Sequence, residues 1–184
     1  MQSYLFLADG FEEVEALGTI DVLRRAGMEV STVSINAGLE VTGAHGVTVK
    51  ADRLIADLDA ATEAEWLICP GGLPGATNLA ACEKLSDMLR AQNAAGRNIA
   101  AICASPAMVL APLGLLEDRR ATCYPGCEQL VTTGTVMTGN PVETDGNITT
   151  GNGPANTFAF ALAIAAQSQG KETADAVASG MLLK

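Results

Sequence analysis

One cysteine lies where a predicted buried strand meets a predicted helix, a position that could hold a nucleophile. The apolar run at residues 98–102 predicts the strand, and Pro106 is typical of a first helical turn. The thiol of Cys103, at the joint, would face free backbone N–H groups and the positive end of the helix, which favours the reactive thiolate. Open α/β folds place their sites at this edge of the sheet. The alternative is an ordinary buried, structural thiol.

Three glutamates open the first predicted helix of the chain: Glu12, Glu13 and Glu15. Acidic residues are common in a first turn because they complement the helix dipole, and we expect two of the three to do only that. Parallel strands present their carboxyl ends at one edge, so one glutamate can also face Cys103. A carboxyl group there could position the sulfur or act as a general acid or base.

A glycine-rich loop, residues 70–75, follows another predicted strand. Glycine permits positive φ and close backbone approach, so the loop is either an ordinary tight turn or a group of N–H donors. In the second case the loop N–H groups, together with the N–H of Ala104, would form an oxyanion hole. No Gly-Lys-Ser/Thr follows, which excludes a phosphate-binding P-loop.

The remaining polar candidates have simpler interpretations. His45 is the only histidine and lies in a predicted hairpin turn, where a surface position is expected. Arg24 and Arg25 end the first helix and are interpreted as solvated or capping charges. Four further cysteines are interpreted as structural thiols: Cys69, Cys82, Cys123 and Cys127.

Composition limits the class of protein. The 184 residues carry a formal net charge of −10 without a Lys/Arg cluster, so nucleic acid and anionic membrane surfaces are poor partners. No apolar run is long enough for a membrane span and the start lacks a basic-then-apolar signal. With five cysteines and no C-x-x-C, we expect a cytoplasmic protein. One histidine and no tight carboxylate cluster predict no metal site, and no cofactor is expected.

The order of predicted elements indicates one three-layer α/β/α domain over residues 1–184, with a mostly parallel sheet. We expect a hairpin at 39–50, a connector at 51–58 and short β-like runs within 120–151. Strands are predicted at 3–8, 28–35, 66–69 and 98–102, and helices at 12–26, 82–95, from Cys103 to about 111, at 156–167 and at 173–182.

Taken in register, the motifs resemble the ThiJ/PfpI family, in its DJ-1 branch. The resemblance runs from the first strand to the last helix. It is carried by these segments: ADGFEEVE at 8–15, RRAG at 24–27, GAHG at 43–46, PGG followed by Gly75-Ala76 at 70–76, AAICASP at 100–106 and GNGPANTF at 151–158.

The resemblance implies a flavodoxin-like homodimer with Cys103 as the reactive, redox-sensitive nucleophile. It also implies that Glu15 is protonated and hydrogen-bonds the sulfur, and that Gly72 and Ala104 supply the oxyanion donors. Arg25 and His45 match positions near the dimer interface that can approach the mouth of the active site.

The activities of the family are mixed, and they leave several functions open. A cofactor-free glyoxalase or deglycase acting on methylglyoxal, related reactive aldehydes or glycated products is the first interpretation. A redox-sensing chaperone with little turnover is the alternative. An intracellular cysteine peptidase is disfavoured because Ala104 stands where those members carry histidine. Tyr124 stands before Pro125 where DJ-1 relatives often carry a histidine, which leaves Glu15 or His45 as the general base.

Overall fold

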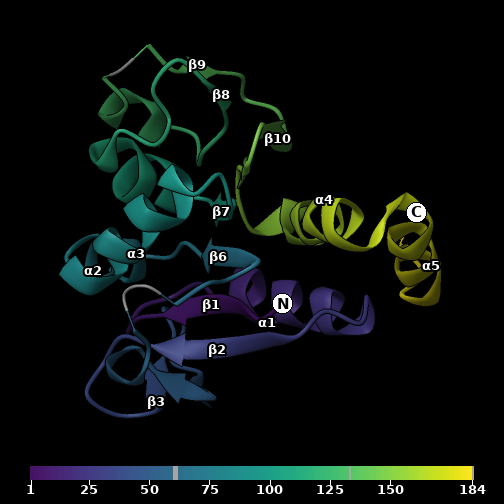
Figure 1. Cartoon of the computed structure of the whole chain (residues 1–184), viewed down its shortest axis with the longest axis horizontal. Helices are drawn as coiled ribbons and strands as arrows, with labels where there is room; N and C mark the ends of the chain where they lie inside the picture. The colour runs from purple at the N-terminus through teal and green to yellow at the C-terminus, as the bar shows by residue number, and fades with distance from the viewer. Residues whose placement is uncertain (60–61, 133, 184) are drawn as a thin grey trace.

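The computed structural model describes residues 1–59, 62–132 and 134–183. Its centre is a seven-stranded sheet in the order β10-β11-β7-β6-β1-β2-β5 (Figure 1). Every neighbouring pair is parallel except β10 with β11. The strands are β1 (Ser3–Leu7), β2 (Val30–Ser34), β5 (Arg53–Leu54), β6 (Trp66–Cys69), β7 (Asn98–Ile102), β10 (Val142–Asp145) and β11 (Ile148–Gly151).

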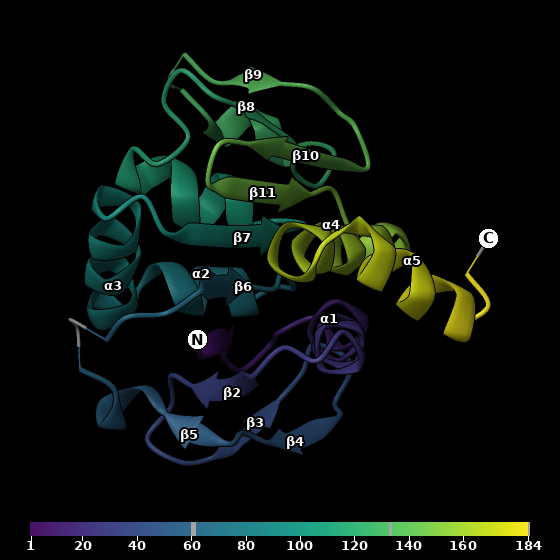
Figure 2. The same ribbon diagram turned by 45° about the vertical axis from the view of Figure 1, so that its right-hand side comes forward.

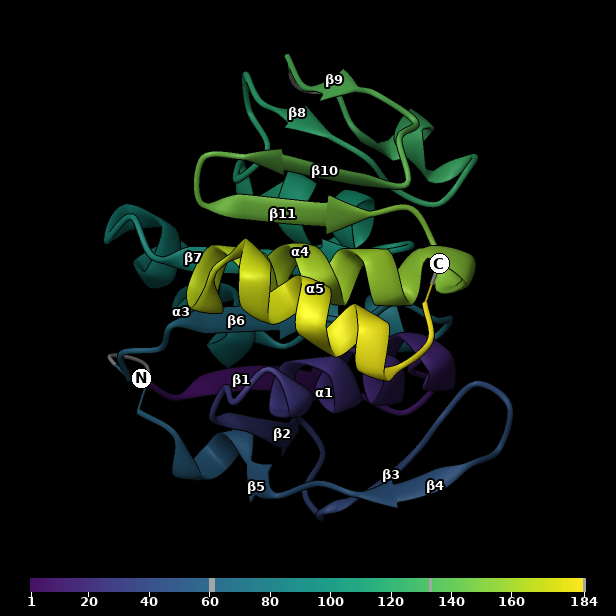
Figure 3. The same ribbon diagram turned by 90° about the vertical axis from the view of Figure 1, so that its right-hand side faces the viewer.

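Helices cover both faces of this sheet (Figures 2 and 3). On one face lie α1 (Glu13–Arg25), α4 (Thr157–Gln169) and α5 (Lys171–Gly180), and α4 packs against the other two. On the opposite face lie α2 (Gly75–Ala80) and α3 (Glu83–Ala94). The three-layer α/β/α arrangement and the mostly parallel sheet that the sequence predicts are therefore confirmed.

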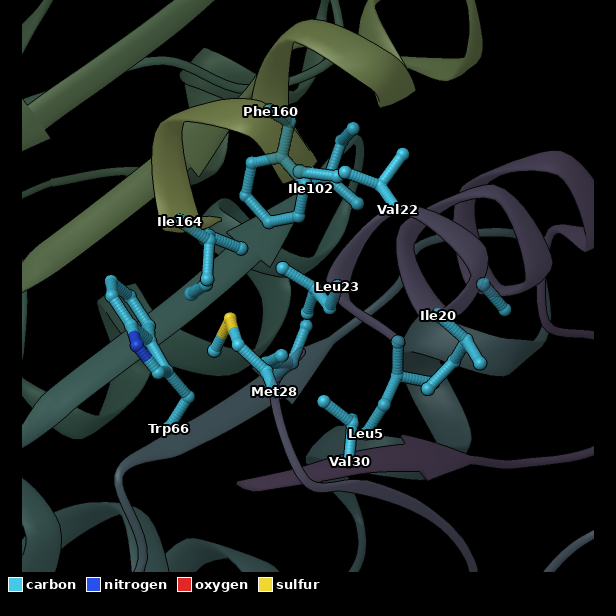
Figure 4. Packing of buried hydrophobic residues seen from close by; sticks show 14 of the residues in the cluster. Leu5, Ile20, Val22, Leu23, Met28, Val30, Trp66, Ile102, Phe160 and Ile164 are labelled. Carbon is cyan, nitrogen blue, oxygen red and sulfur yellow. The ribbon is translucent and has the colours of Figure 1, made fainter. Parts of the chain in front are cut away.

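Successive side chains of a strand point to opposite faces of the sheet, so a separate hydrophobic core forms on each face. Leu5 and Leu7 of β1 belong to the core beneath α1 and α4, whereas Tyr4 and Phe6 belong to the core on the other face. Figure 4 shows the first of these cores, where side chains of α1, α4 and the central strands meet. Trp66 lies at its margin, and its indole N–H donates to the Ser168 hydroxyl at 2.7 Å.

Small two-stranded sheets lie beside the main sheet. The predicted hairpin is β3 (Glu40–Thr42) paired with β4 (Thr48–Lys50), and β8 (Arg120–Ala121) pairs with β9 (Val136–Met137). Over the described residues, no helix combines the length and apolar character that crossing a bilayer requires.

Three segments differ in kind from their prediction, and the ends of several other elements differ by one or two residues. The 51–58 connector contains the edge strand β5, and the glycine-rich loop continues directly into α2, which the sequence pattern does not indicate. The segment after Cys103 is not an α-helix: a π-helical turn at Pro106–Leu110 passes into a 3₁₀ turn at Ala111–Leu113. Pro112 has no N–H to donate to Met108, so a regular helix cannot continue there.

Candidate active site

Cys103 occupies a tight elbow at the carboxyl end of β7. Its φ is +63°, a left-handed conformation that costs a non-glycine residue roughly 1–2 kcal/mol. Two backbone hydrogen bonds hold the elbow: the Cys103 N–H donates to Gly151 O at 2.9 Å, and the Tyr124 N–H donates to Cys103 O at 2.8 Å. The residue is 8% exposed, so the thiol lies at the floor of the site rather than on the surface.

Glu15 reaches this elbow from the first turn of α1. Glu12 caps the helix by accepting the Glu15 N–H at 2.7 Å, which orients the turn. The Glu15 side chain is fully buried; Oε2 accepts the Gly71 N–H at 2.8 Å, and the carboxyl group also hydrogen-bonds the Cys103 side chain. The prediction that one of the three glutamates faces Cys103 is confirmed for Glu15.

The loop between β6 and α2 brings its backbone directly against this pair. A Cβ atom on Gly71 would lie 2.5 Å from Cys103 Cβ and 2.7 Å from Glu15 Oε2, so no larger residue fits. Gly72 has φ +89°, and a Cβ there would collide with the backbone of Glu12. The Ser105 hydroxyl donates to Pro70 O at 2.6 Å and fastens the loop to the elbow. The loop is therefore held as a rigid backbone surface over the thiol.

The backbone N–H groups of Gly72 and Ala104 both hydrogen-bond the Cys103 sulfur and lower the pKa of its thiol. Donors aimed at the nucleophilic atom from two sides are placed to stabilise an oxyanion that forms on a carbon attached to it. The structure thus brings together four residues that the sequence singles out: Cys103, Glu15, Gly72 and Ala104.

Ionisation of Cys103 and Glu15 is opposed by their surroundings. Burial raises the pKa of the Glu15 carboxyl group to about 7. Burial, followed by the charge of Glu15, raises the pKa of the Cys103 thiol to about 12. The Glu15 Oε1 atom is buried without a nitrogen or oxygen partner in the described part of the chain, which further favours a neutral carboxyl group.

The expected effect of free N–H groups on the thiolate is present, since the Ala104 N–H lowers the pKa of the Cys103 thiol, but burial outweighs it and the net pKa is raised. The following turn is five residues long and π-helical, so it provides little dipole, while burial acts against the charged sulfur. Protonation of Glu15 removes the second cause of the raised thiol pKa and supplies a proton that can be donated to the sulfur. The thiolate form of Cys103 is therefore favoured when the Glu15 carboxyl group is neutral.

Glu13 has a role that sequence reasoning missed. Its Oε1 accepts the His45 N–H at 2.7 Å, and its Oε2 contacts His45 Nδ1 at 2.8 Å, so it holds the β3–β4 turn onto α1. The hydrogen bond to Glu13 raises the pKa of His45. Burial by itself would raise the pKa of the Glu13 carboxyl group, but the hydrogen bonds that it accepts, first those from His45, outweigh burial and lower this pKa. The expectation that two of the glutamates only complement the helix dipole is wrong, since Glu12 caps and Glu13 anchors the turn.

The predicted absence of a tight carboxylate cluster is also corrected. One ligand atom from each of Glu12, Glu13 and His45 lies within 4.8 Å of the others. These atoms already serve the helix cap and the hairpin contact, and exposed acidic groups of this kind are common in the absence of a metal.

Arg25 and Tyr124 have different relations to the site. Arg25 lies at the far end of α1 from Glu15, where its Nε pairs with Asp21 Oδ2 at 2.8 Å, so within one chain it stays away from Cys103. Its position at a dimer interface stays a prediction, as does that of His45. Tyr124 is joined to the elbow through its backbone, and its ring lies over Gly153 at the same sheet edge.

Comparison with known proteins agrees with this geometry. The sequence profile described as the DJ-1/PfpI family matches residues 1–167. The Arabidopsis thaliana protein DJ-1 homolog A is 39% identical over 179 residues, which are 97% of this chain and 45% of that protein. The chain thus spans less than half of this relative, and 40% of its homolog B from the same plant.

Two further relatives are similar over nearly their whole length. A protein from Pyrococcus abyssi that is named a deglycase is 31% identical over 162 residues, 87% of this chain and 95% of its own. The structure of oxidized Toxoplasma gondii DJ-1 superposes with a TM-score of 0.94 at 36% identity, covering 98% of this chain and 97% of that one. With the profile match over most of its length, the chain belongs to the DJ-1/PfpI family.

Proposed function

We propose that this protein is a cofactor-free, cysteine-dependent enzyme of the glyoxalase or deglycase type, acting on methylglyoxal or related reactive carbonyl compounds and their adducts. The observation that supports it is the contact between the Cys103 sulfur, a buried Glu15 carboxyl group and the N–H groups of Gly72 and Ala104. A family relative named a deglycase supports the same class of chemistry. All five cysteines are free thiols in the structure, in keeping with a cytoplasmic enzyme.

In the proposed reaction, the Cys103 thiolate attacks the aldehyde carbon of methylglyoxal and a C–S bond forms. The carbonyl electron pair moves to oxygen, where the N–H groups of Gly72 and Ala104 stabilise it, a contribution of roughly 3–4 kcal/mol per donor in well-studied enzymes. The oxygen then takes the proton of the neutral Glu15 carboxyl group to give a hemithioacetal, which leaves Glu15 as a carboxylate.

Glu15, as the carboxylate, next removes the proton from the former aldehyde carbon and returns it to the neighbouring carbon through an enediol. This internal redox step produces a lactoyl thioester on Cys103. Water hydrolyses the thioester, releasing lactate and the free thiol, so methylglyoxal and one water account for all atoms of the product.

The decisive experiment measures methylglyoxal consumption and lactate formation by the wild-type protein and by Cys103→Ser. We expect turnover that the substitution abolishes. Glu15→Gln is the companion variant: it should lower turnover by about 10²–10⁴-fold, the usual value of general acid–base catalysis, while iodoacetamide still alkylates Cys103. Turnover that survives Cys103→Ser, or full activity in Glu15→Gln, would contradict the assignment.

A redox-sensing chaperone is the second candidate, and a solved relative in an oxidized state favours it. The same thiol would be oxidised to sulfenic and sulfinic acid, with the two N–H donors stabilising the oxygen atoms. Mass spectrometry after mild peroxide treatment separates the candidates. Oxygen added selectively at Cys103 in a protein without aldehyde turnover supports the sensor, whereas equal oxidation of all five thiols removes its basis.

We also propose that the protein acts as a homodimer through α1 and α4. Val14, Leu17 and Phe158 leave 49%, 41% and 37% of their surface exposed on these two helices, and Gly18 lets them approach closely beside Phe158. A contiguous apolar face of this kind is typical of a protein interface. The third interpretation, a peptidase, loses support because Ala104 follows the nucleophile and Glu13 holds the sole histidine, His45.

A further inference from the structure

A cavity of about 250 Å³ opens beside the Cys103 elbow without including the thiol itself. It is smaller than most sites for whole cofactors or drug-sized ligands, which span about 300–1,000 Å³, so it fits a small group. The residues that matter for its chemistry are Cys123, Pro125, Glu128, Met137, Thr138 and Asn152.

The walls of this cavity are fixed to the nucleophile from both directions. Tyr124 lies between the lining residues Cys123 and Pro125, and its N–H donates to Cys103 O at 2.8 Å. Gly151 directly precedes the lining residue Asn152 and accepts the Cys103 N–H at 2.9 Å. The cavity wall therefore adjoins the backbone of the Cys103 elbow on both sides.

The described lining of the cavity carries a negative charge and no positive one. Glu128 supplies a carboxylate, and none of the described residues that line the cavity is Lys, Arg or His. One Glu128 oxygen, Oε2, accepts the Gly126 N–H at 2.6 Å, which orients the carboxylate. Pro125 and Met137 add apolar surface next to it. A group that matches this lining is a cation on a short apolar stem, and an anionic group would be repelled.

Asn152 and Thr138 already form hydrogen bonds within the wall of the cavity. Asn152 Oδ1 accepts from Asn156 Nδ2 at 2.7 Å, and the Thr138 hydroxyl accepts the Asn140 N–H at 3.2 Å. These contacts orient the polar side of the cavity, and Glu128 is the charged side chain among its described lining residues.

We propose that this cavity is a subsite for a protonated amine, so that the enzyme prefers reactive carbonyl compounds that carry an ammonium group on a short stem. The inference rests on the proposed function, because it makes Cys103 the group that reacts with the carbonyl end while Glu128 binds the ammonium end. Glu128 is then a specificity residue, without a part in the bond-making steps.

The test uses three methanethiosulfonate reagents that differ in charge: the 2-aminoethyl, the methyl and the 2-sulfonatoethyl compounds. In each reaction the Cys103 thiolate attacks the sulfenyl sulfur, an S–S bond forms and methanesulfinate leaves. Peptide mass spectrometry after timed quenching gives the rate at Cys103 separately from the other thiols. No turnover of any carbonyl substrate is needed.

We expect the aminoethyl reagent to modify Cys103 about three- to tenfold faster than the methyl reagent, and the sulfonatoethyl reagent to be slower than both. Glu128→Gln should remove most of the advantage of the aminoethyl reagent and leave the methyl reagent unchanged, since glutamine can still accept the Gly126 N–H. The control Glu172→Gln removes the same charge from α5 and should leave the order intact.

Equal effects of Glu128→Gln and Glu172→Gln, or no dependence on reagent charge, would overturn the subsite while leaving Cys103 reactive. A Cys103 that reacts with none of the three reagents would overturn the proposed function and the subsite together. The two failures are therefore distinguishable in one set of measurements.

Discussion

The carboxyl group of Glu15 is close to the midpoint of its titration at neutral pH, because burial raises its pKa to about 7. Its neutral form stabilises a thiolate on Cys103, whereas its ionised form can accept a proton from carbon. A group poised in this way can serve both the attack and the proton transfer. The raised pKa is thus an expected property of the proposed chemistry, and it also makes a prediction about stability.

Glu15→Gln should change how the free energy of unfolding depends on pH. In the wild type, the unfolded chain loses the Glu15 proton near pH 4.5, while the folded chain keeps it until about pH 7. Stability from this group is therefore fully present below pH 4.5 and is lost as pH rises towards 7, by about 3 kcal/mol. Relative to the wild type, Glu15→Gln should gain about that amount between pH 4.5 and 7.5, measured by urea unfolding at several pH values.

Glu12→Gln is the matched control for this measurement, because it removes a carboxylate from the same turn and keeps an oxygen that can cap the Glu15 N–H. Parallel pH profiles for the wild type and Glu15→Gln would show that Glu15 ionises in the folded protein as it does in the unfolded one.

Sequence reasoning found the residues whose chemistry is visible in their type and missed those defined by distance. Cys103 and Ala104 follow from the elbow, whereas the choice of Glu15 among three glutamates and of Gly72 within its loop comes from the family resemblance. Gly71 matters only because of the space that Cys103 and Glu15 occupy around it. The raised pKa of Cys103 depends likewise on burial, which no local pattern gives.

At the scale of elements, the turn of the β3–β4 hairpin is held by the Glu13 side chain, in addition to the Asp9 side chain, which accepts the Thr42 N–H, and a backbone hydrogen bond from Ala44 to Phe11. Glu13 of α1 accepts the His45 N–H and contacts the imidazole, and it also accepts the Val47 N–H at 3.5 Å. Gly43 must lack a side chain because Glu13 occupies the space beside it. The turn is thereby fixed next to the helix end that carries Glu15.

Glu13→Ala should release the hairpin turn while leaving the sheet intact. Hydrogen exchange at the His45 and Val47 amides should accelerate by at least about tenfold, because a charge-assisted hydrogen bond is worth about 1.5–3 kcal/mol. Mass spectrometry of peptides over residues 43–47 measures the change, and peptides over β1 serve as the internal reference. Unchanged exchange in the turn would mean that the hairpin holds its own position without Glu13.

Elements with a strong periodic pattern were predicted closely, and those set by backbone geometry were not. The prediction for β6 coincides with Trp66–Cys69, because four apolar residues between Glu65 and Pro70 admit only a short buried strand. The six-residue helix α2 begins with Gly75 and carries too few residues for a recognisable pattern. The turns after Cys103 depend on Pro112 and on Gly114, whose φ of +73° ends the segment.

At the scale of the whole molecule, the fold class followed from the order of strand and helix patterns alone. The antiparallel pairing of β10 with β11 and the edge position of β5 did not follow, because strand order depends on which elements pack together in space. The packing of α1 against α4 brings together residues more than a hundred positions apart in the sequence. The same packing creates the apolar face that we assign to the dimer.

The dimer leads to a prediction for the assembled protein. Light scattering coupled to size exclusion should give twice the chain mass at micromolar concentration for the wild type. Leu17→Glu should give the mass of one chain, because burying an unpaired charge in the interface is strongly unfavourable. Val136→Glu, at an exposed apolar residue of β9 outside α1, α4 and the hairpin, is the matched control and should remain dimeric. A monomeric wild type would remove any contribution of a second chain to the site.

The N–H groups that contact the Cys103 sulfur, which we propose as oxyanion donors, belong to the main chain, at Gly72 and Ala104. Substituting a side chain leaves a backbone N–H in place, so an alanine scan cannot remove either donor by itself. Removing one donor requires exchanging an amide for an ester by chemical synthesis or ligation. Over evolutionary time the same property lets the surrounding side chains vary, as long as the loop keeps its course over the thiol.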